Sequence, residues 1–406
     1  MPESLEDVFR REAGRCTATL IRVAEAFTIA AERWPVDGVP PNPGGWITTT
    51  ARNRAIDRMR RESTRTDRHL AAHRLTIEED MEPDPNSELD DLDAFIDVVA
   101  DDQLRLMFLC CHPSLAADAQ VALTLRLLGG LDTPEIARAF LVPEPTVAQR
   151  IVRAKRKLRD NHAPYRIPRA AELPDRLQAV LTAIYVIYTE GHTATSGDSL
   201  TRVDLSSEAI RLGRVLVELM PDEPEGVGLL ALMLLTEARR PGRIDEAGAM
   251  VRLADQDRTR WNRTLIAEGH QLVRACLRRN HPGPFQVQAA IAAVHADAQT
   301  ADATDWSQIV ALYDQLYALR PTPVVALNRA VAIGERDGAN AGLAALAALG
   351  GSLLDDYQPY HAARADLLAR AGQRNDAVAA YDRAMDLTSN PAERDFLRAR
   401  RAATIT

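Results

Sequence analysis

The spacing of apolar residues predicts helices along almost the whole chain. In the N-terminal part, residues 3–34 carry apolar side chains at helical spacing, and a second helix is predicted from Trp46 to about Arg61. The intervening segment, 35–45, is too rich in Pro and Gly for a helix to cross. A helical pattern returns at Leu92 and continues, with turns, to Arg159. Ala, Leu and Arg dominate and aromatic residues are few, which favours an all-α fold.

The C-terminal part also reads as one helix after another. From Leu173 onwards the pattern is interrupted by Gly and Pro at 191, 221, 241–242, 282–284, 321–323 and 350–351. The segment Tyr357–Asn390 has 34 residues, the length of a tetratricopeptide unit. It carries small and aromatic residues where paired helices would touch, at Ala365, Gly372, Ala377, Tyr381 and Ala384. We therefore expect an array of helical repeats.

Length and composition narrow the class of protein. At 406 residues the chain is too long for one compact core and should form several domains. No run of about 18 apolar residues is present, so no membrane span is expected. The N-terminus is acidic and lacks the apolar region of a signal peptide, which predicts a cytoplasmic protein.

Four cysteines in so long a chain do not form a disulfide framework. Cys110, Cys111 and His112 together could suggest a metal site. However, adjacent cysteines lack the spacing of a zinc ligand set, and the apolar run 104–109 leads into them. Buried thiols are the better interpretation, and no metal or cofactor is expected.

Charge is unevenly distributed along the chain. The net charge of −8 argues against a protein that coats nucleic acid over its whole surface. Segment 52–74 has eight arginines against three acids, segment 78–102 has twelve acids and no base, and segment 150–159 has six bases and no acid. Two basic segments separated by an acidic one predict two distinct contacts with nucleic acid.

The strongest local motif is a helix-turn-helix at residues 131–159. We expect Thr133 to cap a short helix that ends near Phe140, followed by a four-residue turn and a second helix opened by Pro145. On that helix one apolar stripe is formed by Val147, Ile151, Ala154 and Leu158. The opposite face carries Thr146, Gln149, Arg150, Arg153, Arg156 and Lys157. This arrangement suits a major-groove recognition helix, although a helical hairpin with a solvated basic face is the alternative.

The roles of these polar residues follow from their positions on the second helix. Thr146, Gln149 and Arg150 lie nearest its N-terminus and are expected to reach base edges. Arg153, Arg156 and Lys157 lie further along and are expected to contact phosphates.

The first basic helix has a composition suited to reading an unpaired strand. Asn53 and flanking threonines such as Thr49 offer neutral donors and acceptors for an unstacked base, beside the aromatic Trp46. Phosphate contacts are expected from Arg54, Arg58, Arg60 and Arg61. Taken alone, this segment could equally be a solvated basic helix.

The order of these parts resembles the extracytoplasmic-function (ECF, group IV) sigma factors of the sigma-70 family. The region 2 pattern of that family, which melts and reads the promoter minus-10 element, maps onto Trp46, Ala51, Arg52, Asn53, Asp57, Arg60 and Arg61. Its region 4 helix-turn-helix, which binds the minus-35 element, maps onto 131–159. Residues 173–406 resemble the tetratricopeptide-type extension of one subgroup, in the stretches 209–213, 229–233, 255–261, 324–330 and 361–368.

The resemblance implies a division of the chain into four parts. Residues 1–75 would be a shortened region 2, 76–93 an acidic linker, 94–161 region 4, and 170–406 the helical extension. On the order of four helical turns that the family carries between Leu20 and Phe27 are absent. That surface docks on core RNA polymerase in the family, and here Glu25, Phe27 and Trp34 remain as candidate polymerase contacts.

No enzymatic site is evident in the extension. Polar groups at 188–192 and 255–261 lack a nucleophile–base pair, a phosphate loop or a spaced metal ligand set. The 255–261 cluster is better interpreted as internal packing and ion pairing, and a helical array of this size offers a surface for a peptide, protein or small ligand. The sequence thus predicts a sigma factor that partners core RNA polymerase and promoter DNA. One alternative is a helix-turn-helix regulator with a helical sensor domain that acts without polymerase. The other is a repeat scaffold whose basic N-terminal half is incidental.

Overall fold

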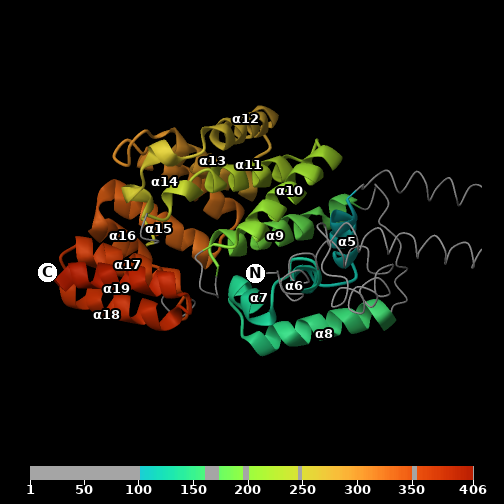
Figure 1. Cartoon of the computed structure of the whole chain (residues 1–406), viewed down its shortest axis with the longest axis horizontal. Helices are drawn as coiled ribbons and strands as arrows, with labels where there is room; N and C mark the ends of the chain where they lie inside the picture. The colour runs from blue at the N-terminus through green and yellow to red at the C-terminus, as the bar shows by residue number, and fades with distance from the viewer. Residues whose placement is uncertain (1–100, 161–172, 195–200, 246–248, 350–353, 406) are drawn as a thin grey trace, which may run out of the picture. The chain divides into compact units, whose positions relative to one another are not determined.

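The computed structural model describes residues 101–160, 173–194, 201–245, 249–349 and 354–405 (Figure 1). Every regular element in these ranges is a helix, and no strand occurs among them, which confirms the all-α prediction. The chain divides into two compact units, residues 1–183 and 184–406. The predicted helices at 3–34 and 46–61 and the acidic linker lie outside the described residues.

The described part of the first unit contains four complete helices and the start of a fifth. These are α5 (Asp102–Cys110), α6 (Ala117–Leu127), α7 (Thr133–Phe140), α8 (Glu144–Asp160) and the first half of α9 (Leu173–His192). Helix α6 contacts α5, α7 and α8, so it joins the other three helices in the described part of this unit. The Arg176 guanidinium donates to the Phe108 carbonyl oxygen at 2.9 Å, which ties the start of α9 to α5.

The adjacent cysteines are part of this core, as the apolar run before them predicts. Cys110 and Cys111 are free thiols with 5% and 0% of their surface exposed. The Cys111 sulfur lies 3.7 Å from the Thr124 hydroxyl. Burial raises the pKa of each thiol to about 12, so both are protonated at neutral pH. Cys276 is likewise free and buried, whereas Cys16 lies outside the described residues.

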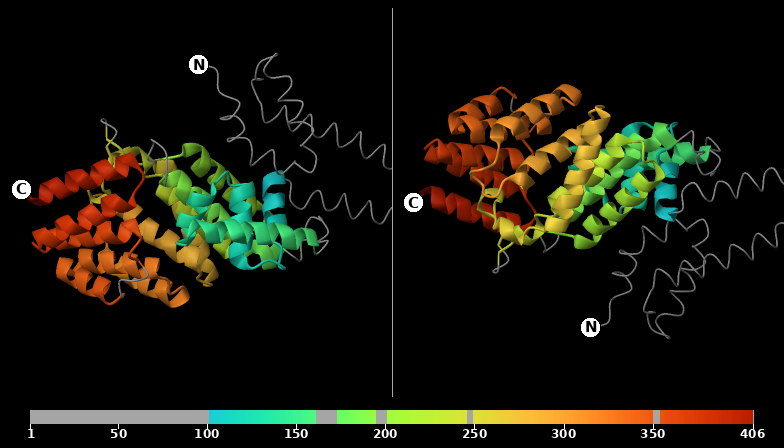
Figure 2. Two further views of the ribbon diagram at one scale, coloured as in Figure 1. Left: turned by 90° about the horizontal axis from the view of Figure 1, so that it is seen from below. Right: turned by 90° about the horizontal axis from the view of Figure 1, so that it is seen from above.

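The second unit is a succession of helices in which each contacts a neighbour close in sequence (Figures 1 and 2). After the second half of α9 come α10 (Val203–Leu219), α11 (Pro224–Glu237), α12 (Arg263–Arg279), α13 (Pro284–Asp297), α14 (Trp306–Leu319), α15 (Pro323–Asp337), α16 (Ala339–Ala347), α17 (Gln358–Arg370), α18 (Arg374–Leu387) and α19 (Pro391–Ile405). Short 3-10 turns, η2 (Arg240–Gly242), η3 (Leu253–Asp255) and η4 (Arg258–Arg260), lie between α11 and α12. Helix boundaries fall at the predicted breaks near 221, 282–284 and 321–323.

Small residues let α17 and α18 pack closely, as the 34-residue segment predicts. Ala365, Ala377 and Ala384 are fully buried in one cluster with Tyr381. The prediction that Gly372 lies at this contact is wrong, because Gly372 is exposed in the turn between the two helices. Its φ of 76° is a conformation that glycine adopts without strain. The pair is therefore a helical hairpin, and its assignment to the tetratricopeptide class stays a prediction.

Gly191 has a different role from the predicted helix end. Helix α9 continues to His192, and a Cβ atom at Gly191 would lie 2.3 Å from the Ser206 backbone nitrogen. The Arg202 N–H donates to the Gly191 carbonyl at 2.8 Å. Helix α9 ends one residue after Gly191, close to the predicted break, and glycine is required at 191 because the backbones of α9 and α10 approach each other.

The contact between α11 and α13 depends on Gly228 in the same way. An added Cβ would meet the Gln286 backbone nitrogen at 2.7 Å, whereas one at Gly226, on the same helix, would meet nothing within 4 Å. We expect Gly228→Ala to lower the free energy of unfolding by about 1–3 kcal/mol, through overpacking. Gly226→Ala, the matched control, should raise it by up to about 1 kcal/mol through helix propensity. Urea unfolding followed by far-UV circular dichroism measures both, and equal effects would contradict this view of the α11–α13 contact.

Candidate nucleic-acid interface

Helix α7 begins with a reciprocal capping box. The Glu135 N–H donates to Asp132 Oδ1 at 2.8 Å, and the Asp132 N–H donates to Glu135 Oε2 at 2.7 Å. Asp132 is therefore the N-cap, and the prediction of Thr133 is wrong by one residue. The physical reason is that only a cap at 132 places Glu135 at the third helical position, where its carboxylate reaches back to the cap.

The turn between the two helices is one residue shorter than predicted. Helix α7 ends at Phe140 and α8 begins at Glu144, which leaves three residues between them and makes Pro145 the second residue of α8. Leu141 adopts φ 53° and ψ 44°, the left-handed conformation that ends α7. The Thr146 N–H then donates to the Pro143 carbonyl at 2.9 Å, which adds the extra residue to the start of α8.

The predicted apolar stripe packs α8 against the rest of the first unit. Val147, Ile151 and Ala154 have 0%, 6% and 2% of their surface exposed. Helix α8 contacts both α6 and α7. The stripe is thus confirmed at three of its four positions, while the side chain of Leu158 lies outside the described part of the chain. Burial of the apolar stripe sets the rotation of α8 about its helix axis.

The opposite face of α8 is polar and open to solvent. Gln149, Arg153, Arg156 and Lys157 are exposed, and Thr146 and Arg150 are half-buried. Gln149 and Arg153 make no side-chain hydrogen bond or ion pair with any residue that the structure describes. The six residues proposed for minus-35 recognition therefore share one face and remain accessible, which is the arrangement that a groove-binding helix needs.

Two of these side chains are held by the first turn of α6 and by the segment that precedes it. Arg150 Nη1 lies 3.4 Å from Asp118 Oδ2, and Lys157 Nζ donates to the Ser114 carbonyl oxygen. Neither contact was foreseen, because 32 and 43 residues separate the partners in the sequence. With 30% and 61% of the Arg150 and Asp118 side chains exposed, this ion pair is worth at most about 1 kcal/mol. DNA phosphates can replace it.

The remaining predicted site residues are not described. Those assigned to the minus-10 element, Trp46, Thr49, Asn53, Arg54, Arg58, Arg60 and Arg61, lie in the segment 1–100. The candidate polymerase contacts Glu25, Phe27 and Trp34 lie there as well.

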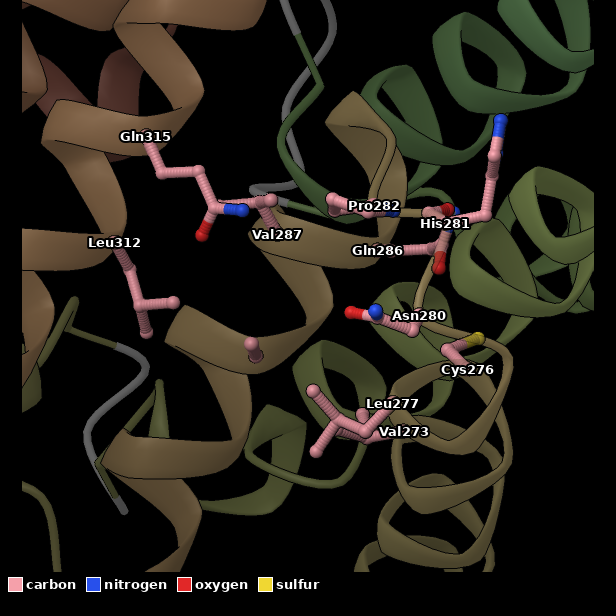
Figure 3. A pocket seen from close by; sticks show the side chains of 11 residues that line it. Val273, Cys276, Leu277, Asn280, His281, Pro282, Gln286, Val287, Leu312 and Gln315 are labelled. Atoms are coloured by element: carbon pink, nitrogen blue, oxygen red, sulfur yellow. The ribbon is translucent and has the colours of Figure 1, made fainter.

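A small cavity in the second unit is lined by both apolar and polar side chains. It has a volume of about 140 Å³ and is bordered by α12, α13 and α14, with Val273, Leu277 and Leu312 among its lining (Figure 3). The thiol of Cys276 also lines it but donates to the Pro224 carbonyl at 3.6 Å. Burial raises the pKa of this thiol to about 11, so it is a poor nucleophile at neutral pH.

The polar cluster at 255–261 serves packing, as predicted, but its ion pair is with a residue outside it. Asp255 pairs with Arg252 at 2.6 Å. The Arg258 guanidinium lies 4.8 Å from the Trp261 ring centroid and donates to the His295 and Ala298 carbonyl oxygens at 2.8 and 2.7 Å. Arg258 thereby caps the C-terminus of α13.

Among the described helices, none is long and apolar enough to cross a membrane.

Comparison with known proteins identifies two domain families in the chain. Sigma-70 region 4 matches residues 105–158, which includes α7 and α8. A "Family of unknown function (DUF6596)" matches residues 176–277. The "Uncharacterized protein R00370" of Rhizobium meliloti (strain 1021) is 44% identical over 375 residues, which are 92% of this chain and 87% of that protein. No solved structure matches. The region 4 domain supports a DNA-binding protein of the sigma-70 family that acts in transcription.

The capping box generates a prediction that separates the two candidate caps. Asp132→Ala removes the acceptor for the Glu135 N–H and should lower the free energy of opening of α7 by about 1 kcal/mol. Thr133→Ala, its neighbour, should have a clearly smaller effect. Amide hydrogen exchange of peptides spanning 131–141 in the full chain measures both. A larger effect at Thr133 would restore the original assignment.

Proposed function

This chain belongs to the protein family that includes R00370 of Rhizobium meliloti (strain 1021) and contains a sigma-70 region 4 domain, and from that premise we propose that it is an RNA polymerase sigma factor of the ECF type. It directs core polymerase to promoters and initiates transcription there. The observation that carries the proposal is the face of α8 opposite the buried Val147 stripe, where amide and cationic side chains are solvent-accessible.

Region 4 reads the minus-35 element through the two ends of that face. Thr146, Gln149 and Arg150 lie on the first two turns of α8, the end that enters the major groove, and contact base edges. Arg153, Arg156 and Lys157 follow and contact phosphates. This division is supported by the exposure of Gln149 and Arg153 and by the lack of acidic residues between 150 and 159.

The proposed contacts with the minus-10 element and with core polymerase are argued from the sequence. The basic segment with Trp46, Asn53 and Arg54 is proposed to bind the minus-10 element, and Glu25, Phe27 and Trp34 to bind core polymerase. The shortened segment before Phe27 favours, as a second candidate, a helix-turn-helix regulator that binds closed duplex without polymerase.

Co-purification with core RNA polymerase followed by run-off transcription distinguishes the two candidates. A sigma factor forms a stable complex with core polymerase and starts transcripts at one promoter. The regulator binds the same duplex but neither joins the polymerase nor supports transcription. If the chain binds promoter duplex but neither joins core polymerase nor supports transcription, the sigma-factor proposal is wrong and the regulator proposal replaces it.

The helical extension is proposed to set the availability of the sigma domains in place of a separate anti-sigma protein. Covalent attachment gives it a high effective concentration at those domains. Because Arg176 of α9 binds the Phe108 carbonyl, a truncation must keep this helix, and a stop after Thr193 is suitable. We expect the truncated chain to change run-off activity severalfold, and unchanged activity would count against this regulation.

Two arginines on α8 should differ in the kind of binding that they support. Arg153→Ala is expected to weaken binding to all duplexes alike and to reduce the salt slope of log K by about 1, since it removes one phosphate contact. Arg150→Ala is expected to reduce discrimination at one promoter base by about 1–3 kcal/mol. Fluorescence anisotropy at several salt concentrations, on promoter and scrambled duplexes, measures both effects. Arg336→Ala, at an exposed arginine of α15 paired with Asp337, is the control and should change neither.

If Arg150→Ala weakens promoter and scrambled duplexes equally, Arg150 contacts phosphate and the proposed base contact is wrong. If none of the α8 variants changes duplex binding, α8 is not the recognition helix.

A further inference from the structure

Three arginines gather in the second unit where the DNA-binding proposal assigns no role. Arg239 and Arg243 follow the end of α11, and Arg258 lies in η4, just before α12. The Asn262 N–H donates to the Ala238 carbonyl at 2.9 Å, which joins the two segments. The turns η2 and η4 contact each other as well. We call Arg239, Arg243 and Arg258 the arginine cluster.

Two members of the cluster are fixed by neutral oxygen atoms. Arg243 donates to the His192 carbonyl and, at 3.0 Å, to the Thr193 hydroxyl. Arg258, with 7% of its surface exposed, donates to the His295 and Ala298 carbonyls and to the Thr304 hydroxyl. These bonds set the directions of both guanidinium groups without neutralising their charge.

The carboxylates near the cluster do not balance it. Glu237 and Glu393 act on Arg243, but Glu237 is engaged by Arg240, whose Nε lies 2.9 Å from its Oε1. Burial lowers the pKa of Arg258, and no carboxylate of the described residues offsets this effect. The cluster therefore keeps an excess of positive charge where water is partly excluded.

Arg239 is the member of the cluster that has no hydrogen-bond or ion-pair partner among the described residues. Its side chain is half-buried. The charged groups that act on it are Arg243 and Arg258, and its other neighbours are Tyr188 and Tyr313. Burial, reinforced by the two arginines, lowers the pKa of Arg239 to about 10, so it stays cationic at neutral pH.

Neutral polar groups surround this cation. His192 and His295, each half-buried, both have a buried Nδ1 atom without a hydrogen-bond partner. Burial and the arginines lower their pKa values to about 2 and 3, so both imidazoles are uncharged. The pKa of Tyr188, which is 2% exposed, is raised well above its ordinary value by burial, and its phenol stays protonated. The two imidazoles and the phenol thus carry no charge, and Glu237 is the carboxylate that acts on Tyr188.

An unpaired cation beside two like charges is an unfavourable arrangement. Buried charges in proteins are normally paired, and buried polar atoms normally have a partner, because desolvation otherwise costs several kcal/mol. A bound anion would supply the missing charge, and the planar fork of a guanidinium suits the paired oxygens of a carboxylate or phosphoryl group.

We propose that Arg239, flanked by Arg243 and Arg258, is the anchor of an anion-binding site in the helical array, and that it takes the carboxylate or phosphoryl group of a small molecule. Arg239, Arg243, His192 and His295 are each half-buried, so the site is reachable yet shielded. The site does not depend on the sigma proposal and can be tested without DNA or polymerase.

Isothermal titration calorimetry of the full chain in chloride buffer tests the site. The probes are inorganic phosphate and succinate, each matched for ionic strength with sodium chloride. We expect saturable 1:1 binding of at least one of them and at least a tenfold loss of affinity in Arg239→Met. Arg214→Met, at an exposed arginine paired with Glu268, is the matched control and should bind as the unaltered chain does. Tighter binding of phosphate would indicate a phosphorylated ligand, and tighter binding of succinate a carboxylic acid.

A second measurement separates ligand binding from a purely structural role of Arg239. Hydrogen exchange of peptides spanning 235–245 and 256–262 should slow on addition of the anion in the unaltered chain, but not in Arg239→Met. Without anion, Arg239→Met should unfold at the same or a higher temperature, since an unpaired cation has been removed. Arg239→Lys, which keeps the charge but loses the fork, should bind with intermediate affinity and serves if the methionine variant does not fold.

Absence of saturable binding of both probes would overturn the proposal. So would undiminished binding by Arg239→Met, or a clearly lower unfolding temperature of this variant in chloride buffer.

Discussion

Burial of one apolar stripe on α8 is the constraint from which the candidate interface follows. Val147, Ile151 and Ala154 occupy the space against α6 and α7, and this fixes how the helix is rotated about its axis. Because helical side chains repeat every 3.6 residues, the residues between them must then face solvent. Gln149 and Arg153 are exposed for this reason, and the polar face exists because the apolar face is buried.

Close backbone approach has the corresponding role in the helical array. Gly228 lies against Gln286 of α13, Gly269 against Leu235 of α11, and Ala365 in the hairpin of α17 and α18 is completely buried. Such contacts do not need a strict sequence repeat, because any small residue at the point where two helices cross permits them. Long-range bonds add to them, as when Asn390 donates to the Ala194 carbonyl at 2.9 Å. An array can thus form although its sequence repeats only loosely.

Arginines serve two physically different purposes in this chain. Arg153 and Arg156 on α8 are exposed, so the phosphate contacts proposed for them would be screened by salt and readily exchanged. The arginine cluster is partly shielded from water, so its electrostatic interactions are stronger, and leaving one of its cations unpaired is unfavourable. The Arg150–Asp118 pair belongs to the first kind, and Arg239 to the second. Abundance of arginine in the sequence does not distinguish them, but exposure does.

The sequence by itself determined the all-α class, the helix-turn-helix, the buried thiols and three positions of the α8 stripe, because each follows from periodicity or from residues a few positions apart. It placed the N-cap of α7 one residue too late and made the turn before α8 one residue too long. At both places two neighbouring residues could start the helix, and hydrogen-bond geometry decides between them. Only the tertiary structure revealed why Gly191 is a glycine, that Asp118 reaches Arg150, and that Arg239 and Arg258 share one cluster. These features join residues distant in the chain, and local spacing carries no information about which distant residues packing brings together.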